Sequence, residues 1–186
     1  YAARLAPHHL LHVTCTGYIS PSAPQVYFAG RDQAPAITHA YHMGCYAAMP
    51  AIRLAQSLVS SGTASVDVAH TEMCSLHMDA ATHTAEQLIV QSLFADGHIV
   101  YRASAQQPHG ESLRIIMVKE KLLPDSKQDM TWVASQFGMQ MSLSKEVPTK
   151  IALALSDFIS DVCQELDLSW EDLQANADFA IHPGGP

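Results

Sequence analysis

The sequence predicts an α/β fold, because short apolar strands alternate along the chain with apolar helices. Strands are predicted where β-branched and other apolar residues run together, and helices where apolar residues recur three and four positions apart. The chain has 186 residues and is 48% apolar, which is enough to build a buried core and too hydrophobic for a disordered segment. One domain, or one and a part of another, is expected for this length.

The first part of the chain supplies most of the predicted sheet. Strands are predicted at 10–14, 66–69 and 98–102. Apolar helices are predicted at 45–59 and at 84–94, because apolar side chains recur at helical spacing in both segments. A glycine follows each of these helices within a few residues, and glycine is a common stop signal.

The later part of the chain begins after a polar stretch. Residues 104–112 form the most linker-like segment, and the composition beyond them is richer in Lys, Asp and Glu. A strand is predicted at 113–118, and a helix is predicted to open at Pro148. Its apolar stripe comprises Ile151, Leu155, Phe158, Ile159, Val162 and Leu166. A last strand is predicted at 177–182.

Charge and composition exclude several classes of function. The chain carries 10 Lys and Arg against 18 Asp and Glu, a formal charge of −8. This balance leaves no positively charged face that could bind the phosphate backbone of a nucleic acid. We therefore expect no nucleic-acid partner. No stretch approaches the roughly 18 uncharged apolar residues that a membrane-spanning helix needs, so no membrane span is expected.

The cysteines and histidines argue against a disulfide scaffold and against a metal site. The four cysteines are far apart and form no Cys-x-x-Cys pair, which suits a reducing cytoplasm. The 11 histidines show no His-Glu-x-x-His or similar spacing that would place two imidazoles around a metal. We expect a cytoplasmic protein without a bound metal.

Two residues stand where a reactive side chain could act. Cys45 follows Gly44 at the predicted start of an apolar helix, where backbone N–H groups and the helix dipole favour a thiolate. It could be a nucleophile, or a buried cysteine that packs as a small apolar residue. His182 ends a predicted strand and precedes Pro-Gly-Gly-Pro. Its imidazole could pair with a thiolate, donate to a developing oxyanion, or bond to a backbone carbonyl.

Six short motifs occur in order along the chain. Four are His-Met-Gly-Cys45-Tyr-Ala-Ala-Met-Pro-Ala-Ile-Arg-Leu-Ala, Leu-Phe94-Ala-Asp-Gly, Leu-Ser-Lys-Glu-Val-Pro148 and His182-Pro-Gly-Gly-Pro. The other two are Val13-Thr-Cys-Thr-Gly17, which precedes the first of these, and Leu123-Pro-Asp-Ser126. The ordered set resembles the type III polyketide synthases, the chalcone-synthase-like branch of the thiolase superfamily. The resemblance runs nearly from end to end of the chain.

This resemblance implies a thiolase-like fold, a layered α-β-α-β-α arrangement that is incomplete in this chain. Residues 1–105 would form part of the first half, which carries the nucleophile. Residues 106–186 would form part of the second half and end at the His-Pro-Gly-Gly-Pro turn. Residues 1–6 read like the last turn of a helix, so the chain is expected to begin inside the first half.

The resemblance also implies a role for each candidate residue. Cys45 would accept the acyl group, His182 would keep the thiol ionised and stabilise the thioester oxyanion, and Phe94 would be an aromatic gatekeeper beside them. Donors already aimed at the developing charge lower the barrier for decarboxylating a malonyl thioester by several kcal/mol. On composition alone, Phe94 could instead be an ordinary core residue.

Two pocket positions depart from the family pattern, and a third matches only some members. Met141 stands where the family usually has a second aromatic gatekeeper, which would allow an adaptable or longer pocket. Ser20 stands where plant members have a methionine that reaches across the dimer interface. Cys15 matches a cysteine at the pocket wall of some bacterial members. The asparagine of the family's His–Asn donor pair has no counterpart here, and the residues that hold coenzyme A are unknown.

The implied activity is acyl transfer followed by condensation. Cys45 would take an acyl group from a coenzyme A or carrier-protein thioester, and the carbanion from a decarboxylated malonyl thioester would attack it in a Claisen condensation. The expected partners are acyl-CoA, malonyl-CoA or acyl carrier protein and a second copy in a homodimer, with no permanently bound cofactor. Alternatives are a ketosynthase that joins two carrier-bound chains and a non-catalytic thiolase-fold half acting in dimerisation. A cysteine hydrolase would need an orienting group that the spacing does not locate.

Overall fold

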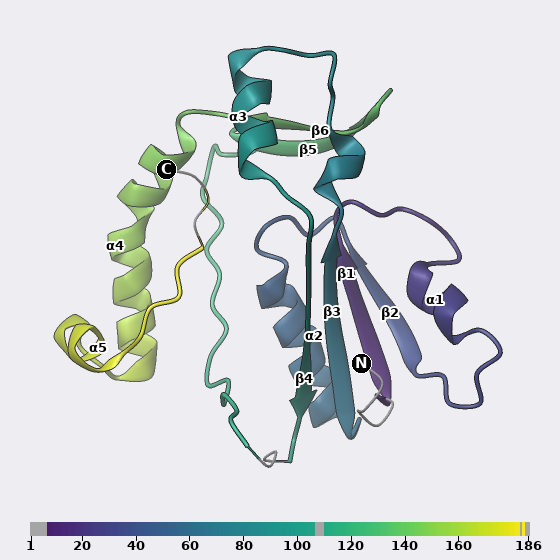
Figure 1. Ribbon diagram of the computed structural model, residues 1–186. Coiled ribbons are helices and arrows are strands. Elements are labelled where there is room, and N and C mark those ends of the chain that lie inside the picture. The colour runs from purple at the N-terminus through teal and green to yellow at the C-terminus, as the bar shows by residue number, and fades with distance from the viewer. Residues whose placement is uncertain (1–6, 107–109, 183, 185–186) are drawn as a thin grey trace. The chain divides into compact units, whose positions relative to one another are not determined.

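The computed structural model describes residues 7–106, 110–182 and 184, and the chain divides into two compact units (Figure 1). The first unit comprises Tyr1–Met78 and Ala95–Val118, and the second comprises Asp79–Phe94 and Lys119–Pro186. The expected helix end at 1–6 lies outside the described residues, as do residues 183, 185 and 186 of the C-terminal turn.

The first unit is built on a four-stranded sheet in the order β2-β1-β3-β4. Its strands are β1 (His9–Thr14), β2 (Ala36–Tyr41), β3 (Ser65–Glu72) and β4 (Gly97–Ser104). β1 lies parallel to both β2 and β3, whereas β4 runs antiparallel to β3. Parallel neighbours require crossover connections, and α1 (Ala23–Phe28) and α2 (Ala48–Ser60) lie in those connections.

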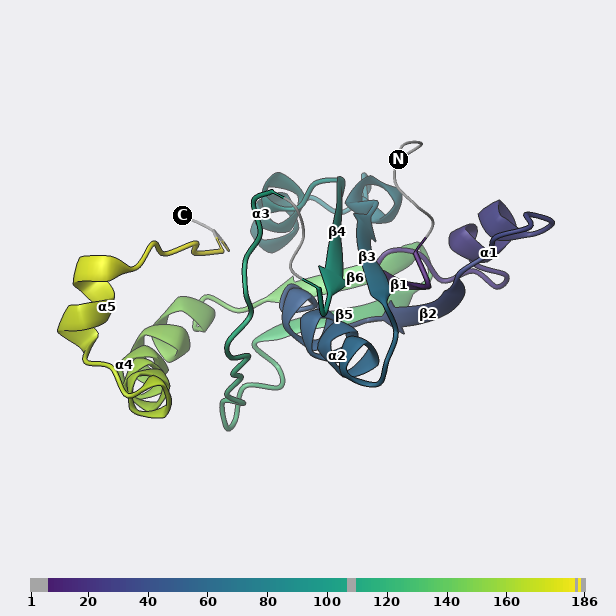
Figure 2. The ribbon, with the colours of Figure 1, turned by 90° about the horizontal axis from the view of Figure 1, so that it is seen from below.

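The core of the first unit lies between the sheet and α2. The cluster comprises Leu11, Val13, Val66 and Val68 from the strands and Ala47, Ala51 and Ala55 from the start and inner face of α2. The three alanines recur every four residues, so they share one face of the helix, and their small side chains allow a close approach to the strands. Figure 2 shows α2 lying along one face of the sheet. Side-chain alternation sends the intervening strand residues to the opposite face.

In the second unit, α3 (Ala85–Leu93) packs on a hairpin of β5 (Met130–Ser135) and β6 (Gly138–Leu143). The Gln87 side chain donates a hydrogen bond to the backbone carbonyl of Met141 at 3.0 Å. This bond joins the first turn of the helix to the middle of β6.

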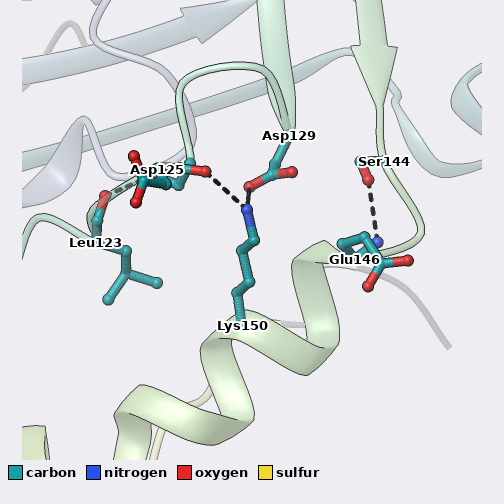
Figure 3. A network of polar contacts seen from close by, with 7 residues as sticks. Leu123, Asp125, Asp129, Ser144, Glu146 and Lys150 are labelled. Carbon is teal, nitrogen blue, oxygen red and sulfur yellow. Dashed lines mark hydrogen bonds and ion pairs between the residues drawn. The ribbon is translucent and has the colours of Figure 1, made fainter.

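The remainder of the second unit consists of α4 (Val147–Leu166) and the short α5 (Trp170–Asn176). Lys150, in the first turn of α4, donates to the carboxylate of Asp129 at 2.5 Å and to the carbonyl of Asp125 at 2.8 Å (Figure 3). These contacts tie the start of α4 to the loop that precedes β5.

Most of the predicted elements are confirmed. The predicted strands at 10–14, 66–69 and 98–102 correspond to β1, β3 and β4, each of which is longer than predicted. The predicted helices correspond to α2, α3 and α4.

The strands predicted at 113–118 and 177–182 are wrong. In the described part of the chain, neither segment joins a sheet. Leu113 is 97% exposed and Ile181 is 82% exposed. An apolar run forms a strand only where a neighbouring strand takes up its backbone hydrogen bonds, and no described strand pairs with either of these two segments.

The predicted division at 105/106 concerns the two halves of a larger fold, and it stays a prediction.

Among the residues that the structure describes, no helix is both long and apolar enough to cross a membrane.

Candidate active site

The candidate site lies in the first unit, where the parallel strands β1, β2 and β3 end. The loops that follow these strands contain Cys15, Cys45 and Cys74, respectively. In open α/β sheets, the carboxyl ends of parallel strands form the edge at which ligands bind. The topology therefore places three cysteines, widely separated in sequence, at one edge of the sheet.

Cys45 lies in a glycine-led turn just before α2. Gly44 has a backbone φ of +77°, in the left-handed region that favours glycine, and its carbonyl accepts a hydrogen bond from the Ala47 N–H at 3.0 Å. This turn occupies the residues expected to form the first helical turn, so α2 begins at Ala48 and not at Cys45. Cys45 is exposed, as a nucleophile must be.

The pKa of the Cys45 thiol is raised above its ordinary value. The largest cause is the loss of water around the sulfur, although the residue as a whole is exposed, and the negative charge of Glu72 adds to it. A backbone hydrogen bond acts in the opposite direction and does not outweigh these two effects. The direction is opposite to the lowering that a helix N-terminus favours, because desolvation of the sulfur dominates, and α2 begins only at Ala48.

Cys15 is buried directly behind this turn. The Gly44 N–H donates to its sulfur at 3.1 Å, so the pocket-wall candidate contacts the loop of the candidate nucleophile. Burial raises the pKa of the Cys15 thiol, the Gly44 hydrogen bond lowers it, and Glu72 raises it further. Cys15 is therefore held as a neutral thiol at neutral pH, consistent with a lining residue.

Glu72 organises the loop that contains Cys15. Its two carboxylate oxygens accept hydrogen bonds from the Cys15 N–H at 2.9 and 3.0 Å, and one also accepts from the Thr16 hydroxyl at 2.8 Å. That hydroxyl in turn accepts from the Met73 N–H at 2.8 Å, while the His77 ring bonds to the Thr16 carbonyl. The loops after β1 and β3 are thereby locked together.

Cys74 is the third thiol at this edge. Its pKa is raised by burial first, and then by the charges of Glu72 and Asp96. Asp96 binds the backbone N–H and the hydroxyl of Ser75 at 2.8 and 2.7 Å, which fixes the short 3-10 turn Cys74–His77. Among the residues that the structure describes, no three His, Cys, Asp or Glu side chains are arranged to hold a metal ion.

The other predicted pocket residues divide between the two units. Ser20 is exposed in the loop that leads to α1, in the first unit. In the second unit, Phe94 caps the C-terminus of α3 and is half-buried, and Met141 is buried in β6 at 7% exposure. His182 is exposed, and its carbonyl accepts a hydrogen bond from the Gly184 N–H at 3.0 Å.

The sequence is similar along most of its length to two curated polyketide synthases of Dictyostelium discoideum. It is 26% identical over 184 residues to probable polyketide synthase 1 and 27% identical over 183 residues to polyketide synthase 37. Each alignment covers 95% of this chain but only 6% of the relative. No family model matches the chain.

Solved structures of polyketide synthases superpose on this chain. Over 86% of this chain, the TM-score with 1,3,6,8-tetrahydroxynaphthalene synthase of Streptomyces coelicolor A3(2), a bacterial type III polyketide synthase, is 0.75 at 21% identity. Over 94% of the chain, it is 0.71 at 23% identity with the C-terminal type III domain of Steely1, a type I/III hybrid from Dictyostelium. PKS-I of the brown alga Ectocarpus siliculosus gives 0.75 at 22% identity over 89% of the chain. This chain has the fold of the type III polyketide synthases.

The superposition confirms the expected thiolase-like fold and its incompleteness in this chain. The 186 residues span 46%, 48% and 45% of the three solved chains, respectively, so they account for about half of the type III polyketide synthase fold. The resemblance inferred from the ordered motifs is confirmed by the curated polyketide synthases, which match 95% of the chain, together with the solved type III structures.

Proposed function

We propose that the protein is a polyketide synthase that condenses an acyl thioester with a malonyl thioester through an acyl group bound to Cys45. The observation that supports the proposal is the position of Cys45. It is an exposed thiol on a glycine-led turn, at the carboxyl edge of parallel strands, in a chain with the type III polyketide synthase fold. Coenzyme A thioesters would be substrates, and no permanently bound cofactor is required.

The chemistry would proceed in two stages. In the first, the Cys45 thiolate attacks the carbonyl of the acyl thioester, and the coenzyme A thiolate leaves and takes up a proton. In the second, the malonyl thioester loses CO₂, the resulting carbanion forms a carbon–carbon bond to the acyl carbon, and the Cys45 thiolate leaves. Hydrogen-bond donors aimed at the thioester oxygens would stabilise the negative charge that develops in both stages.

The raised pKa of Cys45 makes a cationic partner necessary in this scheme. Its own surroundings in the first unit favour the protonated thiol at neutral pH, because the sulfur has lost part of its hydration and Glu72 is negative. An imidazolium would form an ion pair with the thiolate and would also donate to the oxyanion. We assign this role to His182, with Phe94 and Met141 as walls of the acyl pocket and a homodimer as the working form.

A mass-tagged acyl-CoA tests the proposal in the full-length gene product. The acyl group should be recovered on the peptide that contains Cys45, and Cys45→Ala should abolish both labelling and condensation. Cys74→Ala is the matched control, because Cys74 lies at the same strand edge, and it should retain labelling at Cys45. Label that moves to Cys15 or Cys74 in Cys45→Ala would overturn the assignment.

The choice of acyl donor separates the remaining possibilities. Acyl-CoA and acyl carrier protein are supplied in separate reactions, with malonyl-CoA or malonyl carrier protein as the extender. Condensation from coenzyme A thioesters supports a type III synthase, whereas condensation only from carrier-bound chains indicates a ketosynthase. No acyl-enzyme with any donor would indicate a non-catalytic thiolase-fold half.

A further inference from the structure

Two histidines from neighbouring strands face each other on the side of the first unit's sheet that α2 does not cover. Leu11 and Val13 of β1 point into the core against α2, so His12 between them points to the opposite face. In the register of the parallel pair β1 and β2, His12 is the partner of His39, whose neighbour Ala40 packs against the same core. The register therefore brings together two imidazoles that lie 27 positions apart in the sequence. We call His12 and His39 the histidine pair.

The spacing of the histidine pair fits two ligands of one metal ion. His12 Nδ1 lies 3.4 Å from His39 Nδ1, and the ring planes are nearly perpendicular, at 86°. A strong hydrogen bond from an N–H group spans about 2.9–3.0 Å, so this contact is a weak one. Two nitrogens that each lie about 2.0–2.1 Å from a tetrahedral Zn²⁺ ion are roughly 3.3–3.4 Å apart. Neighbouring ligands of a square-planar Cu²⁺ ion are closer, at roughly 2.8–2.9 Å, so the spacing favours zinc.

Hydrogen bonds at Ser22 determine which nitrogen of His39 carries the proton. The Gln25 side chain accepts from the Ser22 N–H at 2.9 Å, so it is the amide oxygen that also faces the Ser22 hydroxyl at 3.2 Å. The hydroxyl therefore donates to Gln25, and its oxygen accepts from His39 Nε2–H at 2.6 Å. In a neutral imidazole this leaves the lone pair of His39 Nδ1 free on the side of His12. Zinc-binding histidines are oriented by the same kind of bond at the second ring nitrogen.

The surroundings hold His39 in place and leave room for the rest of a coordination shell. Tyr41 stacks on the His39 ring at an interplanar angle of 11°, and Ser22 is only 2% exposed. His12, Ser22 and Tyr41 also line a cavity of about 170 Å³, whereas one water molecule takes up about 30 Å³ in the liquid. In the described part of the chain, no three His, Cys, Asp or Glu side chains surround a metal position. The pair would thus supply two ligands, and water the other two.

The electrostatic environment keeps both histidines in the form that binds a metal. Burial lowers the pKa of His12 most, followed by His39 and His98, and burial also lowers the pKa of His39. Both imidazoles are therefore neutral at neutral pH, as metal ligands must be. To bind zinc through Nδ1, His12 only has to move its proton from Nδ1 to Nε2, so no proton is released. The formal charge of −8 on the chain adds a favourable background for a cation.

We propose that the histidine pair binds a Zn²⁺ ion through His12 Nδ1 and His39 Nδ1. The ion would join β1 to β2 and, through the bond from His39 to Ser22, connect the sheet to the cap of α1. With two protein ligands instead of the usual three or four, the ion is exchangeable. Histidine spacing in the sequence gives no sign of the site, because its ligands come from two strands. The site uses contacts within the first unit and does not depend on the proposed activity.

Hydrogen–deuterium exchange with and without zinc tests the site in the full-length gene product. At a zinc concentration about ten times the dissociation constant, β1 and β2 amides that exchange by separation of the two strands should exchange about tenfold more slowly. His39→Gln can still donate to Ser22 but is a poor zinc ligand, so zinc should not change its exchange. His83→Gln replaces an exposed histidine of the second unit and should respond as the wild type does. Mg²⁺ prefers oxygen ligands and should have no effect.

Two results would overturn the site. The first is exchange of the β1 and β2 amides that is the same at every zinc concentration in the wild type. The second is slowing by zinc in His39→Gln equal to that of the wild type, which would place the ion on other ligands.

Two further variants extend the test. If His39→Gln does not fold, His12→Gln removes the other ligand, and slowing by zinc that persists there would equally overturn the site. Ser22→Ala frees the His39 ring and should weaken zinc binding roughly tenfold. An unchanged zinc affinity in Ser22→Ala would contradict the role of Ser22 in orienting His39.

Discussion

Glu72 is the residue on which the geometry of the candidate site most depends, and the sequence patterns do not single it out. The predicted strand at 66–69 ends before this position, whereas β3 continues to Glu72. Its partners Cys15 and Thr16 lie more than fifty positions earlier in the chain, so only the strand register brings them together. Cys45 and Cys15 could be singled out because the local sequence around each is distinctive.

Removal of the Glu72 charge should make Cys45 more reactive. The carboxylate contributes to the raised pKa of the Cys45 thiol, so Glu72→Gln should lower that pKa and increase the alkylation rate at neutral pH by a few-fold. The rate–pH profile of iodoacetamide labelling at Cys45 measures both quantities. Asp96→Asn removes a charge that acts on Cys74, and it should leave the Cys45 profile unchanged. A Cys45 profile that does not change in Glu72→Gln would contradict this electrostatic role.

His182 should act on Cys45 in the opposite direction to Glu72. If its imidazolium stabilises the thiolate, His182→Gln should raise the apparent pKa of Cys45 and slow malonyl decarboxylation in parallel. Loss of one such donor in comparable sites reduces the rate by roughly 10²–10³. An alkylation profile of Cys45 that is identical in His182→Gln and in the wild type would show that His182 does not stabilise the Cys45 thiolate. His42→Gln is the control, because it replaces a histidine in the loop that contains Cys45.

At the level of elements, the segments with a clear apolar run or helical spacing could be predicted, and the short or half-polar strands could not. The apolar runs of β1 and β3 are buried on both sides, and α2, α3 and α4 show helical spacing. β2 escapes prediction because its sequence, Ala-Ile-Thr-His-Ala-Tyr, is short and half polar. The hairpin β5–β6 escapes prediction because it contains exposed and polar residues, and its β6 strand packs against α3, which is distant in sequence.

The hairpin of the second unit should depend on Met141. This side chain is 7% exposed in β6, so Met141→Ala should destabilise the hairpin by about 2–5 kcal/mol through the cavity it leaves. Met130→Ala on β5 is the matched control, because Met130 is 41% exposed and its truncation should destabilise the hairpin much less. Hydrogen exchange of the β5 and β6 backbone amides under native conditions measures the destabilisation of the hairpin in each variant. Equal protection in the two variants would show that Met141 does not support the hairpin.

At the scale of the whole molecule, many large apolar side chains remain in contact with solvent. The residues Leu122, Leu153, Phe137 and Ile116 are 97%, 77%, 76% and 70% exposed, respectively. Soluble monomers rarely leave so much apolar surface uncovered, since contiguous apolar patches favour association. The solved synthases that share this fold are about twice as long as this chain, which spans 45–48% of them.

A polypeptide limited to these 186 residues should therefore associate in solution and lack condensing activity. The exposed apolar side chains favour aggregation, and the unpaired outer backbone of β2 and β4 offers strand edges to other copies. The full-length gene product should be soluble, dimeric and active. Light scattering and a malonyl-CoA decarboxylation assay on both proteins measure the difference. A monodisperse 186-residue protein that melts cooperatively and releases CO₂ from malonyl-CoA would show that half of the fold is sufficient for catalysis.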